Sequence, residues 1–319
     1  MNFSCRICNN ESDNFFYTVR EMQFGMRDEF NYCECSKCGC LQIINPPENI
    51  SKYYPENYFS FQKQKVSYLK EKLNILRDKH VLGKKNLTGN LLTKIFGKPT
   101  YTNWLVNSKV KFEDKILDVG CGTGELLNRM GNAGFSKAMG IDKFIDKDII
   151  YKNGVKILKK SLFELEKQFD FIMMHHSLEH LPDQHKVFKK LYNLLKPKKK
   201  LLIRTPICSS VAWNQFRENW FALEAPRHYF LHTEKSIKLL AEGHRFKIKN
   251  INYDSRSIQF WASIQYQKDI ALMDERSYFI NPNESIFSKK EINEFEKETK
   301  RLNKNGRADQ AVIYLERID

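Results

Sequence analysis

The sequence predicts an α/β protein built on a doubly wound, mainly parallel sheet, preceded by a small cysteine-rich lobe and a helical connector. Three observations support this fold class. From Lys115 onward, apolar strands alternate with helical segments, which is typical of βαβ units with right-handed crossovers. A Gly-x-Gly-x-Gly turn joins the first of these strands to its helix. Six of the eight cysteines fall within residues 5–40.

These features predict three parts. Residues 1–50 form the cysteine-rich lobe, residues 51–110 the connector, and residues 111–319 the α/β domain, with an aromatic insertion at about 207–232. The lobe has a net charge of −3 and the connector +9, within a total of +15. The positive excess fits either a solvated lysine-rich surface or attraction to an anionic substrate, a membrane surface or nucleic acid.

The beginning of the chain and its hydropathy predict a cytoplasmic protein. The first residues resemble no secretory leader, and no uncharged apolar run reaches the roughly 18 residues that a membrane span needs. In that compartment clustered cysteines bind metal more often than they form disulfides.

Two CxxC pairs, 26 residues apart, predict a tetrahedral Zn²⁺ site with four thiolates in the lobe. All four positions of such a site are filled, so the ion would be structural. Cys33 and Cys40 lie beside the second pair, and either could replace a ligand. The segment between the pairs contains a predicted strand at residues 15–19. The preferred ligands are Cys5, Cys8, Cys35 and Cys38.

The connector begins with an aromatic, proline-containing stretch at residues 46–60 that does not favour a helix. Residues 62–108 are mainly helical, with breaks near Gly83 and Gly97. In the α/β domain, Thr233 is a predicted helix N-cap, and residues 254–287 show no clear pattern. The predicted strands are 116–119, 138–142, 155–158, 169–174, 200–204, 246–253 and 310–315. The predicted helices are 125–133, 184–195, 233–242 and 288–304.

The glycine turn at residues 120–124 predicts a nucleotide site. Glycine lets a backbone approach a ligand without interference from a Cβ atom. Asp118 precedes the turn, and Asp142 ends the next strand, 22 residues after Gly120. An acid in that position can accept hydrogen bonds from both hydroxyls of a ribose. The alternative is an ordinary turn between a strand and a helix.

The stretch Ile116–Gly124 resembles motif I of class I S-adenosylmethionine (SAM)-dependent methyltransferases, and the resemblance covers about residues 110–319. It implies a Rossmann-like, seven-stranded sheet, a turn that wraps the methionine part of SAM, and ribose binding by Asp142. Ser161 stands where the family usually has an acid, so Leu162 is the preferred adenine contact. The implied SAM contacts are Asp118, Gly120, Cys121, Gly122, Gly124, Asp142, Lys143, Leu162, Phe163 and His175.

The stretch from Glu224 to Thr233 follows the fifth strand and supplies candidate substrate residues. His228 is a candidate general base, and Arg227 could clamp a phosphate or carboxylate. Trp220 and Tyr229 are further candidate substrate contacts. The alternative for His228 is a structural hydrogen bond. The alternative for the aromatic residues, such as Trp220, is a hydrophobic lid or a dimer contact. The oligomeric state is therefore open. After the fourth strand, the further catalytic candidates are His176, Glu179 and His180.

The whole layout resembles bacterial methyltransferases of surface-polysaccharide and sugar modification, including sugar C-methyltransferases with an N-terminal zinc segment. Those enzymes carry a Glu-His pair in an EHxxYF-type stretch, where this chain has Arg227 and His228. This chain is also shorter than the sugar C-methyltransferases, which add a further C-terminal domain. We therefore expect O-methylation of an anionic sugar, sugar phosphate or glycan in capsule or O-antigen biosynthesis, with C-methylation of a nucleotide-sugar as the alternative.

Two other function classes predict different sequence features. Methylation of RNA or DNA would fit the charge of +15, but the lobe is negative, the wrong sign for gripping phosphates. The Asn/Asp-Pro-Pro-Tyr/Phe motif of base N-methyltransferases is also absent after the fourth strand, so nucleic acid is disfavoured. A scaffold protein without catalysis predicts a degenerate SAM site, whereas the glycines and Asp142 are intact.

Overall fold

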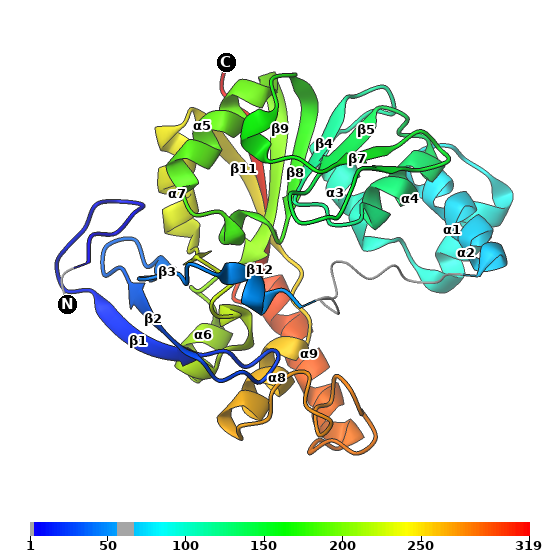
Figure 1. Ribbon diagram of the computed structural model, residues 1–319. Coiled ribbons are helices and arrows are strands. Elements are labelled where there is room, and N and C mark those ends of the chain that lie inside the picture. Colours follow the sequence, from blue (N-terminus) through cyan, green and yellow to red (C-terminus); the bar gives the residue numbers. More distant parts are fainter. Residues whose placement is uncertain (1–2, 56–66) are drawn as a thin grey trace. The chain divides into compact units, whose positions relative to one another are not determined.

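The computed structural model describes residues 3–55 and 67–319 (Figure 1). The part of the predicted connector at residues 56–66 lies outside these ranges. The chain divides into two compact units, each made of three stretches. Unit 1 comprises residues 1–55, 176–188 and 203–313, and unit 2 comprises residues 56–175, 189–202 and 314–319.

Three helices open the described part of unit 2: α1 (Tyr68–Val81), α2 (Leu87–Phe96) and α3 (Thr100–Ser108). Polar side chains cap the first two, because the Ser67 hydroxyl accepts from the Lys70 N–H and the Asn86 side chain from the Gly89 N–H. Gly97, at φ 72°, ends α2 in a conformation that favours glycine. The predicted helices and their breaks are confirmed in residues 67–108.

The central strands of unit 2 are parallel. Ile116 pairs with Ala138 on one side and with Phe171 on the other, and Met139 pairs with Lys156. Every residue of β4 is buried, as expected for a parallel strand that helices cover on both faces. The elements concerned are β4 (Ile116–Val119), α4 (Glu125–Ala133), β5 (Ala138–Ile141), β7 (Lys156–Leu158), η3 (Leu162–Glu164) and β8 (Phe169–His175).

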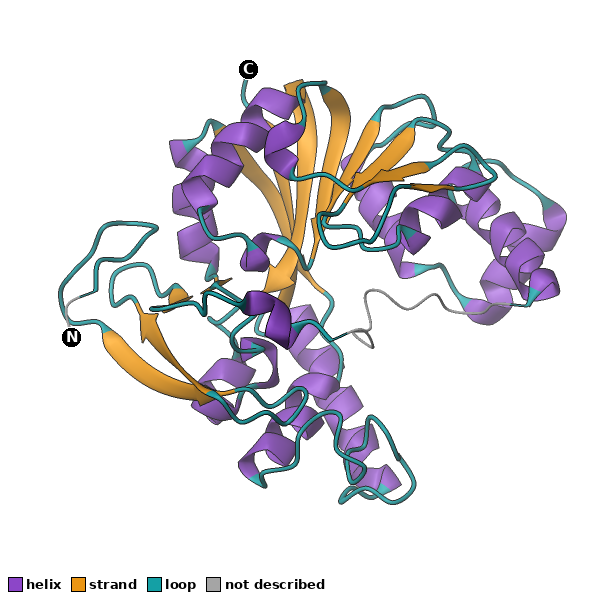
Figure 2. Ribbon diagram, in the orientation of Figure 1, coloured by secondary structure: helices purple, strands orange, loops and turns teal. Residues whose placement is uncertain are grey.

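The full sheet has the strand order β11-β12-β9-β8-β4-β5-β7-β6, and its strands are orange in Figure 2. The predicted α/β fold with a mainly parallel sheet is confirmed. A two-residue edge strand, β6, pairs antiparallel with β7 and adds to the seven predicted strands. The remaining bounds are β6 (Ile149–Ile150), α5 (Gln184–Leu194), β9 (Leu195–Pro206), β11 (Phe246–Tyr253) and β12 (Gln310–Arg317).

Unit 1 contains a second sheet with the order β1-β2-β3-β10. The predicted strand at residues 15–19 is confirmed as β1, whereas β2, β3 and β10 were not predicted. Phe230 of β10 pairs antiparallel with Gln42 of β3, so a late segment completes the sheet that the cysteine-rich segment begins. The strands are β1 (Phe15–Arg20), β2 (Glu29–Glu34), β3 (Leu41–Ile43) and β10 (Phe230–Leu231).

The aromatic segment 207–232 forms part of the core of unit 1. Trp213 and Trp220 are almost fully buried, and their ring centroids lie 5.9 Å apart. Phe260 of α8, a helix in the stretch left unassigned from sequence, packs in the same cluster. Thr233 is confirmed as an N-cap, with its side chain accepting from the Ser236 N–H. The helical elements of unit 1 are η1 (Ile50–Tyr53), η4 (Leu178–His180), α6 (Val211–Phe216), η5 (Arg217–Asn219), η6 (Phe221–Leu223), α7 (Glu234–Gly243), α8 (Ile258–Gln267) and α9 (Lys289–Asn305).

Across residues 3–55 and 67–319, none of the helices combines the length and the apolar character required to cross a bilayer.

Candidate functional site

The glycine turn of unit 2 lies between β4 and α4. Gly120, Gly122 and Gly124 have φ values of 73°, 55° and 78°, in the left-handed region where a side chain is strained. A Cβ atom on Gly124 would also collide with the side chain of Ile157. The turn therefore requires glycine both for its backbone conformation and for its packing.

Asp142, at the end of β5, holds this turn in place. One carboxylate oxygen accepts the Gly122 N–H at 2.9 Å, and the other accepts the Phe144 N–H at 2.9 Å. The carboxyl ends of neighbouring parallel strands share one edge of a sheet, where ligands of doubly wound proteins bind. The predicted ribose acceptor and the predicted glycine turn thus meet at the expected edge.

Asp118 supplies a buried carboxylate on the strand next to Asp142. It is only 3% exposed, and within the described part of the chain its Oδ1 atom has no hydrogen-bond partner. Burial, with a smaller contribution from the Asp142 charge, raises the pKa of Asp118 well above its usual range. A buried acceptor of this kind fits a ligand that brings a cationic or hydrogen-bond-donating group, as the ammonium of SAM would.

The other predicted SAM contacts also lie in unit 2. Leu162 is buried and Phe163 is half exposed on η3, while the Ser161 hydroxyl caps that element. His175, the last residue of β8, packs against Trp104 with ring centroids 4.4 Å apart. Two further contacts lie at the turn and just after β5: the Cys121 thiol donates to the Gly122 carbonyl, and the Lys143 ammonium covers the Phe144 ring.

The four cysteines predicted as zinc ligands gather in unit 1. Their sulfur atoms all lie within 4.8 Å of one another, with Sγ–Sγ distances of 3.6 Å for Cys5–Cys38 and 3.5 Å for Cys8–Cys35. Tetrahedral Zn²⁺ with bonds of about 2.3 Å separates its sulfur ligands by about 3.8 Å. The Ile7 N–H donates to the Cys5 sulfur. The donor set and its spacing fit zinc.

Cys33 and Cys40 lie outside this cluster. Cys33 is fully buried in β2, where burial raises the pKa of its thiol to about 12. The Cys40 sulfur contacts His232 Nδ1 at 3.7 Å. The geometry therefore favours the two CxxC pairs over either replacement.

A second cluster in unit 1 brings together three predicted catalytic candidates, Glu179, His180 and His228. One ligand atom from each lies within 4.8 Å of the others, and the His180 and His228 ring centroids are 4.7 Å apart. Each histidine also meets a backbone carbonyl through Nδ1, His228 that of Ala222 at 2.8 Å and His180 that of Arg227 at 2.9 Å. The cluster joins η4 to the segment around residue 228.

Glu224, which the sequence analysis did not select, belongs to this cluster. Its carboxylate lies 3.1 Å from His228 Nε2. Burial alone would lower the pKa of His228, but the Glu224 carboxylate raises it above its usual value. A Glu-His pair is thus present in space, although Arg227 occupies the adjacent position in sequence. The only sequence signal for this contact was the spacing of four residues between Glu224 and His228, and it lies in a stretch that is not predicted to be helical.

His176, the remaining catalytic candidate, lies at the edge of this cluster. Its Nδ1 is 3.3 Å from Glu179, and its Nε2 contacts the Arg204 guanidinium at 2.7 Å. Arg204 in turn donates to both carboxylate oxygens of Asp254. His176 therefore connects an arginine–aspartate ion pair to the buried Glu179 carboxylate.

The three predicted substrate residues lie in or beside the core of unit 1. Trp220 is fully buried, and its indole N–H donates to Asp309 at 3.0 Å. The Arg227 guanidinium is 1% exposed and donates to Glu21 and to the Tyr53 carbonyl. Tyr229 packs partly buried against the core. These contacts bury the Trp220 and Arg227 side chains, and their role as substrate contacts stays a prediction.

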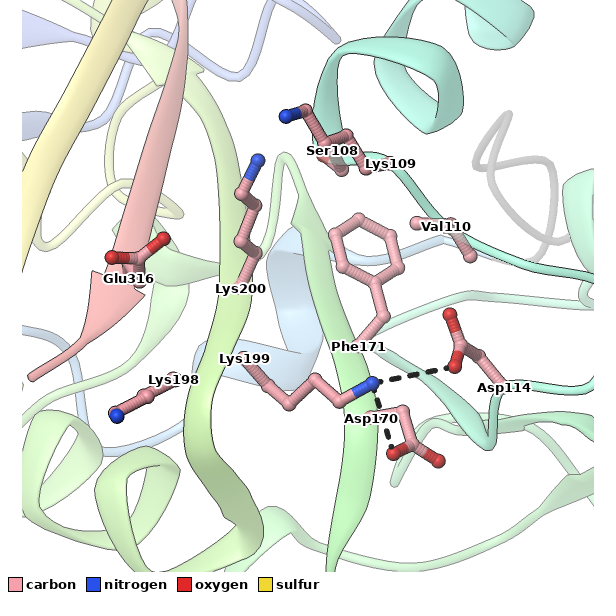
Figure 3. Close-up of a pocket in the computed structure, with 10 residues that line it drawn as sticks. All are labelled: Ser108, Lys109, Val110, Asp114, Asp170, Phe171, Lys198, Lys199, Lys200 and Glu316. Atoms are coloured by element: carbon pink, nitrogen blue, oxygen red, sulfur yellow. Dashed lines mark hydrogen bonds and ion pairs between the residues drawn. The ribbon is translucent and has the colours of Figure 1, made fainter. Parts of the chain in front are cut away.

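A separate cavity of about 260 Å³ in unit 2 contains none of the predicted site residues (Figure 3). The Lys199 ammonium pairs there with Asp114 at 3.4 Å and with Asp170 at 3.3 Å. Asp170 and Phe171 lie at the beginning of β8. Ligands of doubly wound sheets bind at the carboxyl ends of strands, so this cavity lies at the opposite end of β8 from the predicted nucleotide site.

Comparison with known families agrees with the glycine turn. Residues 68–250, more than half of the chain, match the family described as methyltransferase domain. The chain belongs to this family, which confirms the resemblance at that level.

Individual relatives are more distant. The chain is similar, at 29% identity over 110 residues, to a ubiquinone biosynthesis O-methyltransferase of Pseudomonas fluorescens (strain SBW25). That match covers 31% of this chain and 47% of the relative, so the chain spans about half the length of the curated protein that it matches.

Solved structures with a similar fold are more distant still. A magnesium protoporphyrin IX methyltransferase from Synechocystis shows 16% identity and a TM-score of 0.41, covering 64% of this chain and 89% of that chain. A SAM-dependent methyltransferase from Archaeoglobus fulgidus shows 18% identity and a TM-score of 0.40, covering 71% and 98%.

Proposed function

We propose that this protein is an enzyme that transfers a methyl group from SAM. The observation that carries the proposal is the glycine turn tied to Asp142, in a chain that belongs to the methyltransferase domain family. Asp118 adds a buried acceptor beside the turn. The proposed SAM contacts are the residues predicted from motif I, of which Asp142 would hold the ribose and Asp118 would face the methionine end.

Bound SAM would supply an electrophilic methyl group on its sulfonium. The contribution of the chain is to hold donor and acceptor in line and to accept the proton of the acceptor group. The Glu179, His180 and His228 cluster offers imidazole groups for that proton, and His228 is our first candidate. Because burial lowers the pKa of His180 to about 4, His180 is neutral at pH 7 and is the second candidate.

The proposed acceptor is a hydroxyl of a sugar, sugar phosphate or glycan in bacterial surface-polysaccharide biosynthesis. The enzyme is proposed to act in the cytoplasm. The layout of a cysteine lobe before a methyltransferase domain supports this substrate class. The net charge of +9 in residues 51–110 supports an anionic substrate. The similarity to an O-methyltransferase over 110 residues supports oxygen as the acceptor atom.

Sugar C-methylation is the second candidate, and one contact favours it. C-methylation needs a base that removes a carbon-bound proton, and the 3.1 Å contact between Glu224 and His228 restores in space the Glu-His pair that the sequence lacks. Product analysis separates the candidates, because an O-methyl ether and a C-methyl branch give different fragments in mass spectrometry.

We also propose that the cysteine cluster holds a structural zinc ion. Four sulfur ligands leave no position open for a substrate. The two pairs come from segments 26 residues apart, so a bound ion would cross-link the beginning of the chain to the segment that follows β2.

We also propose that the substrate is attached to a glycan carrier in the membrane, so that the protein would act at the membrane surface. Leu87, Leu91 and Ile95, spaced four residues apart along α2, are 90%, 58% and 62% exposed. An exposed apolar stripe beside Lys94 and Lys98 is typical of a helix that lies on an anionic membrane surface. Co-sedimentation with vesicles containing anionic lipid, compared with neutral vesicles and with the Leu91→Glu variant, tests this part of the proposal.

The proposed activity is tested by incubating the full chain with methyl-labelled SAM and a panel of nucleotide-sugars and glycans, followed by mass spectrometry. Calorimetry with SAM alone is done first. The absence of binding would contradict every hypothesis in which this chain is a SAM-dependent methyltransferase. Tight, salt-sensitive RNA binding would instead favour the nucleic-acid alternative.

A further inference from the structure

The Glu179, His180 and His228 cluster has the geometry of a metal site. Glu179 and His180 are adjacent on η4, and His228 comes from a segment almost fifty residues later. One ligand atom from each side chain lies within 4.8 Å of the others. We infer that these three residues bind a divalent transition-metal cation, at a site separate from the four cysteines and beyond the proposed methyl transfer.

Backbone carbonyls orient both histidine rings through Nδ1. A carbonyl oxygen can only accept, so the contacts of His228 with Ala222 and of His180 with Arg227, at 2.8 and 2.9 Å, place a hydrogen on each Nδ1. In a neutral ring this leaves the lone pair on Nε2. His228 Nε2 lies 3.1 Å from the Glu224 carboxylate, so a cation bound there would replace the proton that these two groups share. Metal-ligating histidines in proteins are oriented in the same way, by a second partner on the other ring nitrogen.

The carboxylate ligand is oriented in a similar manner. Glu179 is fully buried, and one of its oxygens, Oε2, accepts the Thr205 hydroxyl at 3.0 Å. The other oxygen, Oε1, lies 3.3 Å from His176 Nδ1. The side chain is thus held before any ion arrives, and such preorganisation is what a bound cation requires.

The charges around the cluster favour a divalent cation. Glu21 and Glu224 share the single guanidinium of Arg227, at 3.1 and 3.3 Å, and Glu179 adds a third carboxylate. A divalent cation beside these three carboxylates would offset part of their negative charge. Protonation of the histidines would also offset it, and metal content distinguishes the two cases.

The donor set indicates which cations would bind. Two imidazoles and one carboxylate suit Zn²⁺, Fe²⁺, Mn²⁺ or Co²⁺, whereas Mg²⁺ and Ca²⁺ prefer oxygen ligands alone. Three protein ligands also leave a position for an oxygen atom, from water or from a hydroxyl of the substrate. When the cation is bound, His180 and His228 are ligands, so their role as proton acceptors belongs to the metal-free form.

Metal stoichiometry of the full chain tests the inference. We expect protein reconstituted with ZnCl₂ to contain two equivalents by elemental analysis, one of which is lost from His180→Ala and from the near-isosteric Glu179→Gln. The remaining equivalent should be lost from Cys35→Ser. Calorimetric titration with ZnCl₂ and MnCl₂ should show at least tenfold weaker binding at the second site in both cluster variants.

The control is His185→Ala, because His185 and His244 form an exposed pair of imidazoles with ring nitrogens 3.0 Å apart, the obvious alternative zinc site. Loss of the second equivalent in this variant, or its retention in Glu179→Gln, would overturn the inference. A wild-type chain that holds one equivalent would do so as well. SAM binding, measured on the same samples, separates failure of this inference from failure of the proposed function.

Discussion

The candidate sites of the two units are built in different ways. In unit 2, the candidate nucleotide site uses backbone conformation and a hydrogen bond across neighbouring strand ends, Gly122 N–H to Asp142. In unit 1, both clusters consist of side chains from distant segments: cysteines from the two CxxC pairs, and Glu179 and His180 with His228. The first kind of site depends on glycine and on local strand order. The second depends on charge, burial and the closure of long loops.

The cysteine cluster gives the largest expected effect. Cys35→Ser should abolish zinc binding at the four cysteines and unfold the sheet of unit 1, because structural Zn²⁺ contributes on the order of 10 kcal/mol to small domains. Zinc content and the thermal unfolding midpoint measure this. Cys33→Ala is the matched control, since Cys33 is equally buried but lies outside the cluster, and it should keep its zinc. A Cys35→Ser variant that has lost this zinc equivalent but keeps an unchanged unfolding midpoint would contradict the structural role.

The second largest effect is expected in the cluster of Glu179, His180 and His228, where a substitution should lower the rate of methyl transfer. His228→Ala should lower turnover roughly 10²-fold or more, whether the imidazole accepts a proton or holds a cation, while the dissociation constant for SAM stays unchanged. Labelled methyl transfer and calorimetry measure the two quantities, with His185→Ala as the control. Wild-type turnover in His228→Ala would show that the residue has only a structural hydrogen bond.

The nucleotide site should show a smaller effect confined to binding. Asp142→Ala removes the carboxylate that accepts the Gly122 and Phe144 N–H groups and that would accept the ribose hydroxyls. We expect roughly tenfold or more weaker SAM binding, measured by calorimetry. Asp146→Ala, an exposed acid four residues further along, should bind SAM like the wild type. Unchanged affinity in Asp142→Ala would mean that the ribose lies elsewhere.

The smallest effect concerns an ion cluster of unit 2. Burial alone would raise the pKa of Asp170, but the Lys115 N–H and the ammonium groups of Lys196 and Lys199 lower it to about 2. A lowered pKa stabilises the fold above the usual value of 3.8, and this contribution disappears as the pH falls toward 2. Asp170→Asn should therefore cost about 1 kcal/mol of unfolding free energy at pH 7 and almost nothing near pH 2. Chemical denaturation at both pH values measures this, and a loss independent of pH would exclude the ion cluster as its cause.

The difference between the two kinds of site also explains how much the sequence could predict. The β4 strand and the α4 helix were predicted with their observed bounds, because buried strands, glycine turns and helix periodicity are local signals. The two-residue strand β10 escaped prediction because it pairs with β3, almost 190 residues away in sequence. No local pattern reports such a pairing.

The same limit applies to individual side chains. His180 and His228 were selected for their chemistry, but their contact depends on tertiary structure. Glu224 was missed because its backbone has a positive φ of 44° and is not helical, so the spacing of four residues to His228 did not predict their contact. Trp220 and Arg227 were selected for their chemistry and their position in a loop, from which their burial could not be predicted.

The alternation of the chain between the two units has a consequence for folding and for protein engineering. Each unit is made of three separate stretches, so neither can be obtained by cutting the chain once. The sheet of unit 1 is complete only when residues 230 and 231 reach β3, and the entropy cost of closing so long a loop must be met before those contacts form. Such non-local pairing slows folding. During synthesis, β3 therefore has no β10 partner until residues 230 and 231 have emerged from the ribosome.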